Sequence, residues 1–381
     1  MIAPIYLSPE RSGVRWLLDP ASPPLAPLAR ELESRTEVTP CESASVAADL
    51  LALPALIRDR HFGLASGLVP VQAGAEAEAL IDAARQRILA TQPTSWGRAL
   101  GDLNDGLRLC LHDRHIRLQG SRPSAIRSAE PTTAVDPSAP AVEVQEQHGV
   151  LCVIVRRLWG GPEDDRLLRD WARNGLRHFQ YDRIVVDLRG NSGGNDTIAY
   201  EWMRPAIPAG ANIPGTSTGW FVGDAPLNIW NVAALIEARD GIDAVPGWLG
   251  AGRHIPAEDD DLELRTETAE PLEAGISPWH GRLLVLVDGG TRSAGESSAW
   301  MLRHALGGRL AGGRTAGMIE FGNIAPYLLP ASGLHIGLAT QHNDFGQPVE
   351  LIGLPVDAEL DPAVPISAVA ADFDLLYGRS G

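Results

Sequence analysis

Residues 283–304 read LLVLVDGGTRSAGESSAWMLRH, a pattern that predicts a buried strand, a glycine turn and an amphipathic helix. The aliphatic run 283–287 ends close to two glycines, which is typical of a strand covered on both faces. Ser293 lies at the turn, beside the unpaired N–H groups that begin a helix, and Glu296 lies where a first-turn acid favours the helix dipole. A serine mounted in this way suits a nucleophile, and helix capping is the structural alternative.

The composition predicts a globular protein with an ordinary buried core. The chain has 381 residues, of which 44% are hydrophobic, and this length predicts two structural units. The N-terminal stretch has no apolar region typical of a signal peptide, and no run of 18 apolar residues occurs, so we expect a cytoplasmic protein. Cys41, Cys110 and Cys152 lack CxxC spacing and predict buried thiols, and we expect neither a metal nor a cofactor.

The charge and the choice of basic residue exclude several classes of function. A formal net charge of -16 argues against nucleic acid and against an anionic membrane as partners, because both require a basic surface. The sequence contains no lysine, so all 32 basic residues are arginine. Mechanisms that need a deprotonated lysine are therefore excluded, including Schiff bases and a Ser-Lys dyad.

The chain divides by pattern into three parts. Residues 1–118 are rich in Ala and Leu at helical spacing and predict an N-terminal helical bundle. Residues 119–142 are crowded with Pro, Ser and Ala and predict a linker. Residues 143–381 show strand-helix-strand order, which predicts an α/β core with a parallel sheet. The bundle contains two similar Asp-Arg-His phrases, which end at His61 and His115.

A second glycine turn follows a strand in the α/β core. The strand leads into Arg189-Gly190-Asn191-Ser192-Gly193-Gly194, which lacks both the GxGxxG pattern and a P-loop lysine. A turn of exposed backbone N–H groups can instead hold an oxyanion. Further on, an irregular Trp-rich insertion at about residues 197–280 contains Trp220, Trp230 and Trp248, which either line an apolar substrate pocket or pack in the core.

Several phrases together resemble the tail-specific (C-terminal-processing) and tricorn-core serine proteases. In chain order these phrases are Asp187 to Gly194, Thr291 to Glu296, Gly313 to Gly317 and Val349-Glu350. The resemblance covers roughly residues 149–357 and implies a ClpP/crotonase-like α/β core with acyl-transfer chemistry on peptide or protein substrates. The phrase ending at His115 resembles the Asp-x-His of that family, at the end of its N-terminal helical region.

Departures from the family pattern favour one branch. Family members with a Ser-Lys dyad have lysine where this chain has Met318. Their PDZ domain would have to lie between His115 and the strand at Gly149, where this chain has only the linker. The chain therefore resembles the tricorn-like branch, which uses serine, histidine and glutamate. A serine nucleophile needs a base that titrates near pH 7, and a base needs an orienting acceptor. The expected catalytic residues are Ser293 as nucleophile, His115 as general base and Glu350 as orienter, with oxyanion donors from Ala294, Gly193 and Gly194.

Other readings stay open at this point. The same triad serves an esterase, a cyclase or another acyltransferase, and the same scaffold can serve a non-catalytic ligand-binding protein. Met318 joins the three tryptophans as a candidate pocket residue, and His61 and His112 are the rivals of His115. The sequence does not decide whether the chain forms a homo-oligomer.

Overall fold

The structure, a computed structural model, falls into two compact units. Unit 1 comprises Met1–Ser128, Ser217–Glu267 and Phe321–Asn343, and unit 2 comprises Ala129–Thr216, Thr268–Glu320 and Asp344–Gly381. The residues that the structure describes are 43–90, 96–119, 138–160, 162–222, 225–226, 262–268, 271–329, 332 and 334–378.

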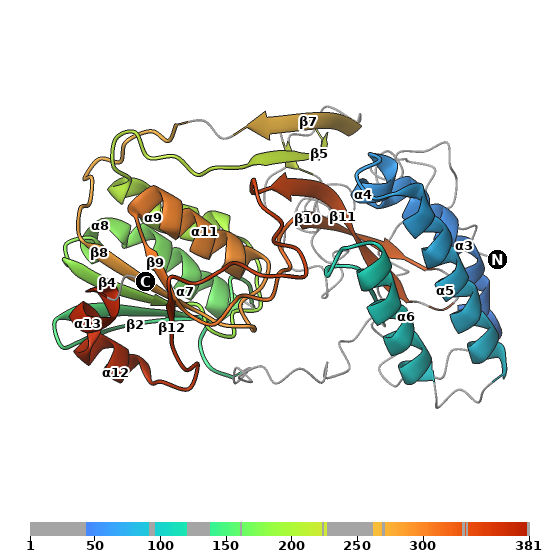
Figure 1. The fold of residues 1–381 in the computed structure, drawn as a ribbon, viewed down its shortest axis with the longest axis horizontal. Helices are drawn as coiled ribbons and strands as arrows, with labels where there is room; N and C mark the ends of the chain where they lie inside the picture. Colours follow the sequence, from blue (N-terminus) through green and yellow to red (C-terminus); the bar gives the residue numbers. More distant parts are fainter. Residues whose placement is uncertain are drawn as a thin grey trace. The chain divides into compact units, whose positions relative to one another are not determined.

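Unit 1 packs helices and a sheet around one apolar core (Figure 1). Helix α3 (Ser43–Arg60) buries apolar residues at three- and four-residue spacing, and helix α5 (Val71–Ala90) does the same with smaller side chains. Helix α4 (Phe62–Ala65) is a short turn between them, and α6 (Trp96–Cys110) packs along α5. These helices form the N-terminal helical region that the sequence predicts.

The sheet of unit 1 joins segments far apart in the sequence. Strand β1 (Arg117–Gln119) pairs antiparallel with β11 (His335–Asp344), which also pairs antiparallel with β10 (Phe321–Leu328). The remaining strands are β5 (Thr216–Val222), β6 (Ala225–Pro226) and β7 (Leu262–Thr268). The sequence pattern predicts one continuous α/β core over residues 143–381, which includes β10 and β11. In the structure these two strands belong to unit 1, because β11 pairs with both β1 and β10.

Unit 2 is built on a six-stranded sheet in the order β12-β9-β8-β4-β3-β2. The pairs β3–β4, β4–β8, β8–β9 and β9–β12 are parallel, and β2 is antiparallel to β3. The strands are β2 (Val142–Gln147), β3 (Val150–Val155), β4 (Arg183–Asp187), β8 (Arg282–Val287), β9 (Arg309–Gly312) and β12 (Ala358–Glu359).

Helices cover both faces of this sheet, which explains the continuous aliphatic run of β8. Leu283, Val285 and Val287 belong to one apolar cluster, and the alternate residues Leu284 and Leu286 belong to another. The first cluster contains residues of α7 (Pro162–Arg173), α9 (Thr197–Met203) and α11 (Ala294–Leu306), and α8 (Gly175–His178) and the 3-10 helix η2 (Arg204–Ala206) lie near α9. The second contains residues of α12 (Ile366–Ala371) and α13 (Phe373–Gly378).

The predicted fold class is confirmed: unit 2 is an α/β core, and helices precede it in the chain. The predicted linker 119–142 lies mostly outside the described residues, and its last residue, Val142, begins β2. Within the predicted insertion, Trp230 and Trp248 lie outside the described residues. Among the described helices, none is long and apolar enough to cross a membrane.

Candidate active site

Ser293 lies on the turn between β8 and α11, directly before the first residue of the helix. Its backbone has φ 51° and ψ -122°, a left-handed φ that non-glycine residues seldom adopt. The Ser293 N–H donates to the Glu296 carboxylate at 3.1 Å and to the Met318 carbonyl at 3.0 Å. The helix start and these two acceptors therefore hold the sharp turn that the sequence predicts.

Glu296 is the buried centre of the turn of residues 288–293, called the nucleophile turn because it carries the candidate nucleophile Ser293. Its carboxylate accepts hydrogen bonds from the Ser293 N–H, the Gly317 N–H at 2.8 Å, the Met318 N–H at 2.8 Å and the Thr315 hydroxyl at 2.5 Å. Burial raises the pKa of Glu296 above its ordinary value, although all four donors favour the charged form. Glu296 thus joins the nucleophile turn to residues 315–318, a role that its place in the first turn of a helix does not reveal.

The second glycine turn lies directly against Ser293. A Cβ placed on Gly193 would lie 3.0 Å from the Ser293 Cβ and 3.4 Å from the Ala294 nitrogen, and the φ of 94° at this residue strongly favours glycine. The Gly193 N–H donates to the Asn191 side chain at 2.8 Å. Within the described residues the N–H groups of Gly194 and Ala294 have no hydrogen-bond acceptor. These two N–H groups are therefore available to a ligand, and that of Gly193 is engaged.

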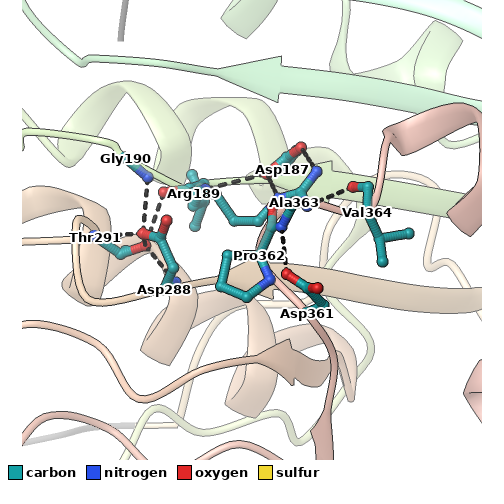
Figure 2. Close-up of polar contacts among 10 residues, drawn as sticks. Asp187, Arg189, Gly190, Asp288, Thr291, Asp361, Pro362, Ala363 and Val364 are labelled. Carbon is teal, nitrogen blue, oxygen red and sulfur yellow. Dashed lines mark hydrogen bonds and ion pairs between the residues drawn. The ribbon is translucent and has the colours of Figure 1, made fainter. Parts of the chain in front are cut away.

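Two carboxylates fix the start of this turn (Figure 2). Asp288 accepts the N–H groups of Gly190 and Gly290, each at 2.8 Å, and that of Thr291 at 3.1 Å. Asp187 binds the Arg189 guanidinium through two hydrogen bonds, at 2.9 Å from Nε and 2.5 Å from Nη2. The two turns are therefore tied together at Asp288, and the chain before the second turn is held at Asp187.

Arg189 also holds the C-terminal segment. Its Nη1 donates to the carbonyl oxygens of Pro362 at 2.8 Å and Val364 at 2.7 Å, next to the Asp187 pair (Figure 2). Burial opposes the charge of Arg189, but the hydrogen bonds and charge of Asp187 hold the pKa of Arg189 above its ordinary value. The segment before α12 thus contacts the residue that precedes the second glycine turn.

Glu350 is buried in unit 2 on the loop after β11. One of its carboxylate oxygens accepts the backbone N–H groups of Ile319 at 2.9 Å and Glu320 at 3.0 Å. Residues 315–320 therefore bind Glu296 at one end and Glu350 at the other. Both carboxylates are oriented by backbone donors, which fixes their directions.

His115 lies in unit 1 beside Asp113 in the loop after α6. Its backbone N–H donates to Asp113 Oδ1 at 2.7 Å, and its ring Nδ1 lies 3.7 Å from the same oxygen. Burial lowers the pKa of His115, the Asp113 charge opposes this shift, and Arg108 adds to it. The imidazole is therefore biased toward its neutral form, which a general base requires.

The rival histidines occupy different positions. His61 is fully buried, and its Nε2 lies 3.0 Å from Asp113 Oδ2. Burial opposes ionisation of Asp113, but the His61 hydrogen bond and the charges of His61 and His115 hold its pKa below the ordinary value. His112 is exposed, with φ 50°, and follows the end of α6 at Cys110, so it does not share a helical face with His115.

A family model described as peptidase family S41 matches residues 168–360, which is just over half of the chain. The chain belongs to peptidase family S41. The predicted resemblance to the tail-specific and tricorn-core serine proteases is therefore confirmed at the level of the family, and the chain is a serine peptidase by family, with peptides or proteins as its class of substrate. No curated protein matches the chain in sequence.

Solved structures similar to this S41 peptidase share little sequence with it. A lipoprotein from Streptococcus agalactiae has a TM-score of 0.49 and 10% identity, with 87% of this chain and 96% of that chain covered. The photosystem II D1 C-terminal processing protease has a TM-score of 0.42 and 13% identity, covering 88% and 98%. The tricorn protease has a TM-score of 0.29 and 15% identity, covering 61% and 17%.

The remaining predicted residues of this S41 peptidase lie in two places. Met318 is half-buried, and its backbone contacts both Ser293 and Glu296. Trp220 is half-buried against the core of unit 1, with its ring 5.4 Å from that of Phe62 in an edge-on arrangement, which is the packing role that the sequence left open. Within each unit taken alone, the described His, Cys, Asp and Glu residues form no group of three placed to bind one metal ion.

Sequence reasoning missed Asp113, Glu296 and Arg189 as residues that organise the site. A signal was present for Asp113, because it stands two residues before His115 in the phrase that suggested the base. Glu296 and Arg189 also lie inside the quoted family phrases, and each has one near partner, Ser293 and Asp187 respectively. Their other partners lie 19 to 22 and 173 to 175 positions away in sequence, so local patterns could not show these distant contacts.

Proposed function

We propose that this S41 peptidase cleaves peptides through an acyl-enzyme on Ser293, with His115 as general base and Glu350 as its orienter. The observation that carries the proposal is the nucleophile turn: Ser293 has a left-handed φ and adjoins the Gly193-Gly194 turn. Left-handed backbone at a strand-to-helix turn is the arrangement that exposes a nucleophilic serine. Helix capping alone does not require a second glycine turn against the same residue.

The reaction follows the usual serine acyl transfer. The Ser293 hydroxyl oxygen bonds to the peptide carbonyl carbon while its proton passes to the neutral imidazole of His115. The tetrahedral intermediate then breaks its C–N bond as His115 returns the proton to the leaving amine. Water repeats the two steps on the acyl-enzyme, which releases the acid and restores Ser293. The proposal requires that His115 of unit 1 reach Ser293 of unit 2.

The oxyanion of each intermediate binds to backbone N–H groups. Ala294 and Gly194 supply these donors in our proposal, because the Gly193 N–H already donates to Asn191. Loss of one such donor in other serine enzymes costs about 3 kcal/mol of transition-state stabilisation. The tricorn-like branch and a cytoplasmic location remain predictions from the sequence.

Labelling with a fluorophosphonate tests this function directly. The probe should form one covalent adduct on Ser293, located by mass spectrometry of the digested protein, and Ser293→Ala should give none while retaining its circular dichroism spectrum. A wild-type protein that remains unlabelled, or a folded Ser293→Ala protein with full peptide turnover, contradicts the proposal. Turnover of matched peptide and ester substrates then separates a peptidase from an esterase or acyltransferase with the same triad.

A further inference from the structure

Trp159 differs from the other tryptophans of unit 2. Trp171, Trp202, Trp279 and Trp300 are buried, whereas the side chain of Trp159 is 50% exposed. It lies in the segment after β3, which ends at Val155. Isolated exposed apolar residues are common on protein surfaces, so exposure alone does not indicate a function.

The segment that carries Trp159 is anchored on its N-terminal side. Arg157 donates to the Asp164 carboxylate from Nε at 3.1 Å and from Nη2 at 2.7 Å, and both side chains are largely buried. Asp164 also accepts the Ala141 N–H at 3.0 Å. Leu158, the next residue, is 1% exposed and belongs to the core of unit 2. Trp159 is therefore presented by a fixed piece of backbone.

The same segment is joined to the second glycine turn. The Leu158 N–H donates to the Gly193 carbonyl at 2.8 Å, and the Asn195 N–H donates to the Leu158 carbonyl at 2.9 Å. A Cβ on Gly194 would lie 2.3 Å from the Leu158 carbonyl oxygen, so the two backbones are in direct contact. Residue 159 thus immediately follows a residue that touches the proposed oxyanion donor.

The indole ring is itself tied to that turn. Its Nε1 donates to the Ser192 hydroxyl at 3.2 Å, which satisfies the one polar atom of the ring and fixes its direction. The rest of the indole offers an apolar surface with few rotatable bonds. Tryptophans held in this way are frequent contributors to binding energy, because ordering them requires little conformational entropy.

We propose that Trp159 forms a binding subsite for an apolar side chain of the peptide substrate, close to the bond that is cleaved. The assignment rests on the proposed function, since Trp159 is placed by its connection to the turn beside Ser293. An apolar side chain, rather than a charged one, is the expected occupant, because the only polar atom of the ring is already bonded to Ser192. Contact between the indole ring and an apolar substrate side chain removes apolar surface of both from water, which favours binding.

Phosphonate probes test the subsite without a known substrate. The pair consists of the diphenyl phosphonates of N-acetylated phenylalanine and alanine analogues, which modify an active-site serine and differ only in one side chain. We expect kinact/KI for the wild type to be about tenfold higher with the phenylalanine probe, a typical discrimination for one apolar contact. Trp159→Ala should reduce this ratio to about twofold through a higher KI, and Trp159→Phe should retain most of it.

Leu176→Ala is the matched control, because Leu176 is an apolar side chain of unit 2 with 43% exposure on α8. It should leave the ratio unchanged. A Trp159→Ala protein that keeps the wild-type ratio, a wild type without any preference, or a loss of kinact that is equal for both probes would overturn the subsite and leave the proposed function standing. A wild type in which neither these probes nor a fluorophosphonate modifies Ser293 overturns the proposed function, and the subsite with it.

Discussion

The two units both hold their proposed catalytic residues by backbone N–H groups that donate to carboxylates, and they differ in what else those carboxylates bind. In unit 2, Ser293 and the second glycine turn are fixed by backbone N–H groups that donate to Glu296 and Asp288. In unit 1, His115 is held beside Asp113, whose other oxygen binds the imidazole of His61. In unit 1 the carboxylate therefore lies between two titratable imidazoles, whereas in unit 2 Glu296 and Asp288 bind backbone N–H groups and threonine hydroxyls. In our proposal, unit 2 supplies fixed geometry and unit 1 supplies the group that accepts the proton.

The largest effect is expected at His115, the proposed general base in unit 1. His115→Ala should lower kcat/KM about 10⁵-fold, because loss of one member of a serine triad removes the action of the whole set. His112→Ala is the matched control, since His112 is exposed in the same loop and should keep the wild-type rate. Steady-state kinetics on a peptide substrate measure both. Near-wild-type activity in His115→Ala would mean that unit 1 does not supply the base through this residue.

The proposed orienter of the base, Glu350, comes next. Glu350→Gln should lower kcat about 10³-fold with a small change in KM, because the amide no longer stabilises the imidazolium. Asp113→Asn should instead lower the free energy of unfolding by about 2 kcal/mol, because one amide oxygen cannot replace the two carboxylate oxygens that bind the His115 backbone N–H and the His61 ring. Kinetics and urea unfolding on both variants separate the two roles. A greater loss of kcat in Asp113→Asn than in Glu350→Gln would assign the orienting role to Asp113.

Glu296→Gln tests the fixed geometry of unit 2. A glutamine has one acceptor oxygen and an NH₂ group, so it cannot accept from the backbone donors at Ser293, Gly317 and Met318 together with the Thr315 hydroxyl. We expect kcat to fall about 100-fold and the rate of fluorophosphonate labelling to fall with it. Unchanged labelling would show that the turn does not depend on this carboxylate.

Arg189→Lys tests the contact between the C-terminal segment and the second glycine turn. A lysine cannot bind Asp187 through two donors and also reach the carbonyl groups of Pro362 and Val364. We expect kcat to fall about tenfold while KM changes little. Arg303→Lys should have less effect, because it changes a guanidinium that donates a single hydrogen bond to Asp357 elsewhere in unit 2. Equal losses of kcat in the two variants would indicate a general effect on stability.

The pH profile should locate the titrating group in unit 1. Burial lowers the pKa of His115 from its ordinary value of 6.5, so the base stays neutral to a lower pH than a free histidine does. The acidic limb of kcat/KM should therefore lie below pH 6.5, with activity lost as the pH falls through it. Asp113→Asn should move the limb to still lower pH, because the Asp113 charge is what raises the pKa. A limb above 6.5 contradicts this assignment.

The sequence predicted the local parts of this fold well. The aliphatic run 283–287 became β8, the turn placed Ser293 before α11, and the glycines at 193 and 194 adopt positive φ. Each of these features depends on neighbouring residues, whose spacing is visible in a linear pattern. The family phrases predicted the α/β core for the same reason.

The sequence could not show contacts between distant segments. Asp113 binds His61 across 52 positions, and β11 pairs with β1 across more than two hundred, so neither leaves a periodic signal. The position of Glu296 in the first turn of α11 cannot show whether its carboxylate only interacts with the helix dipole or also accepts four hydrogen bonds. Arg189 likewise lies within a phrase that suggested only a glycine turn, and its hydrogen bonds to the carbonyl groups of Pro362 and Val364 span 173 and 175 positions.

The most direct test of the central claim, that His115 of unit 1 activates Ser293 of unit 2, is a double-mutant cycle on these two residues. We predict that the Ser293→Ala, His115→Ala double mutant has the same residual kcat/KM, within about twofold, as either single mutant, because the two residues act as one unit. Losses that multiply in the double mutant would show that the two residues act independently and would contradict the account.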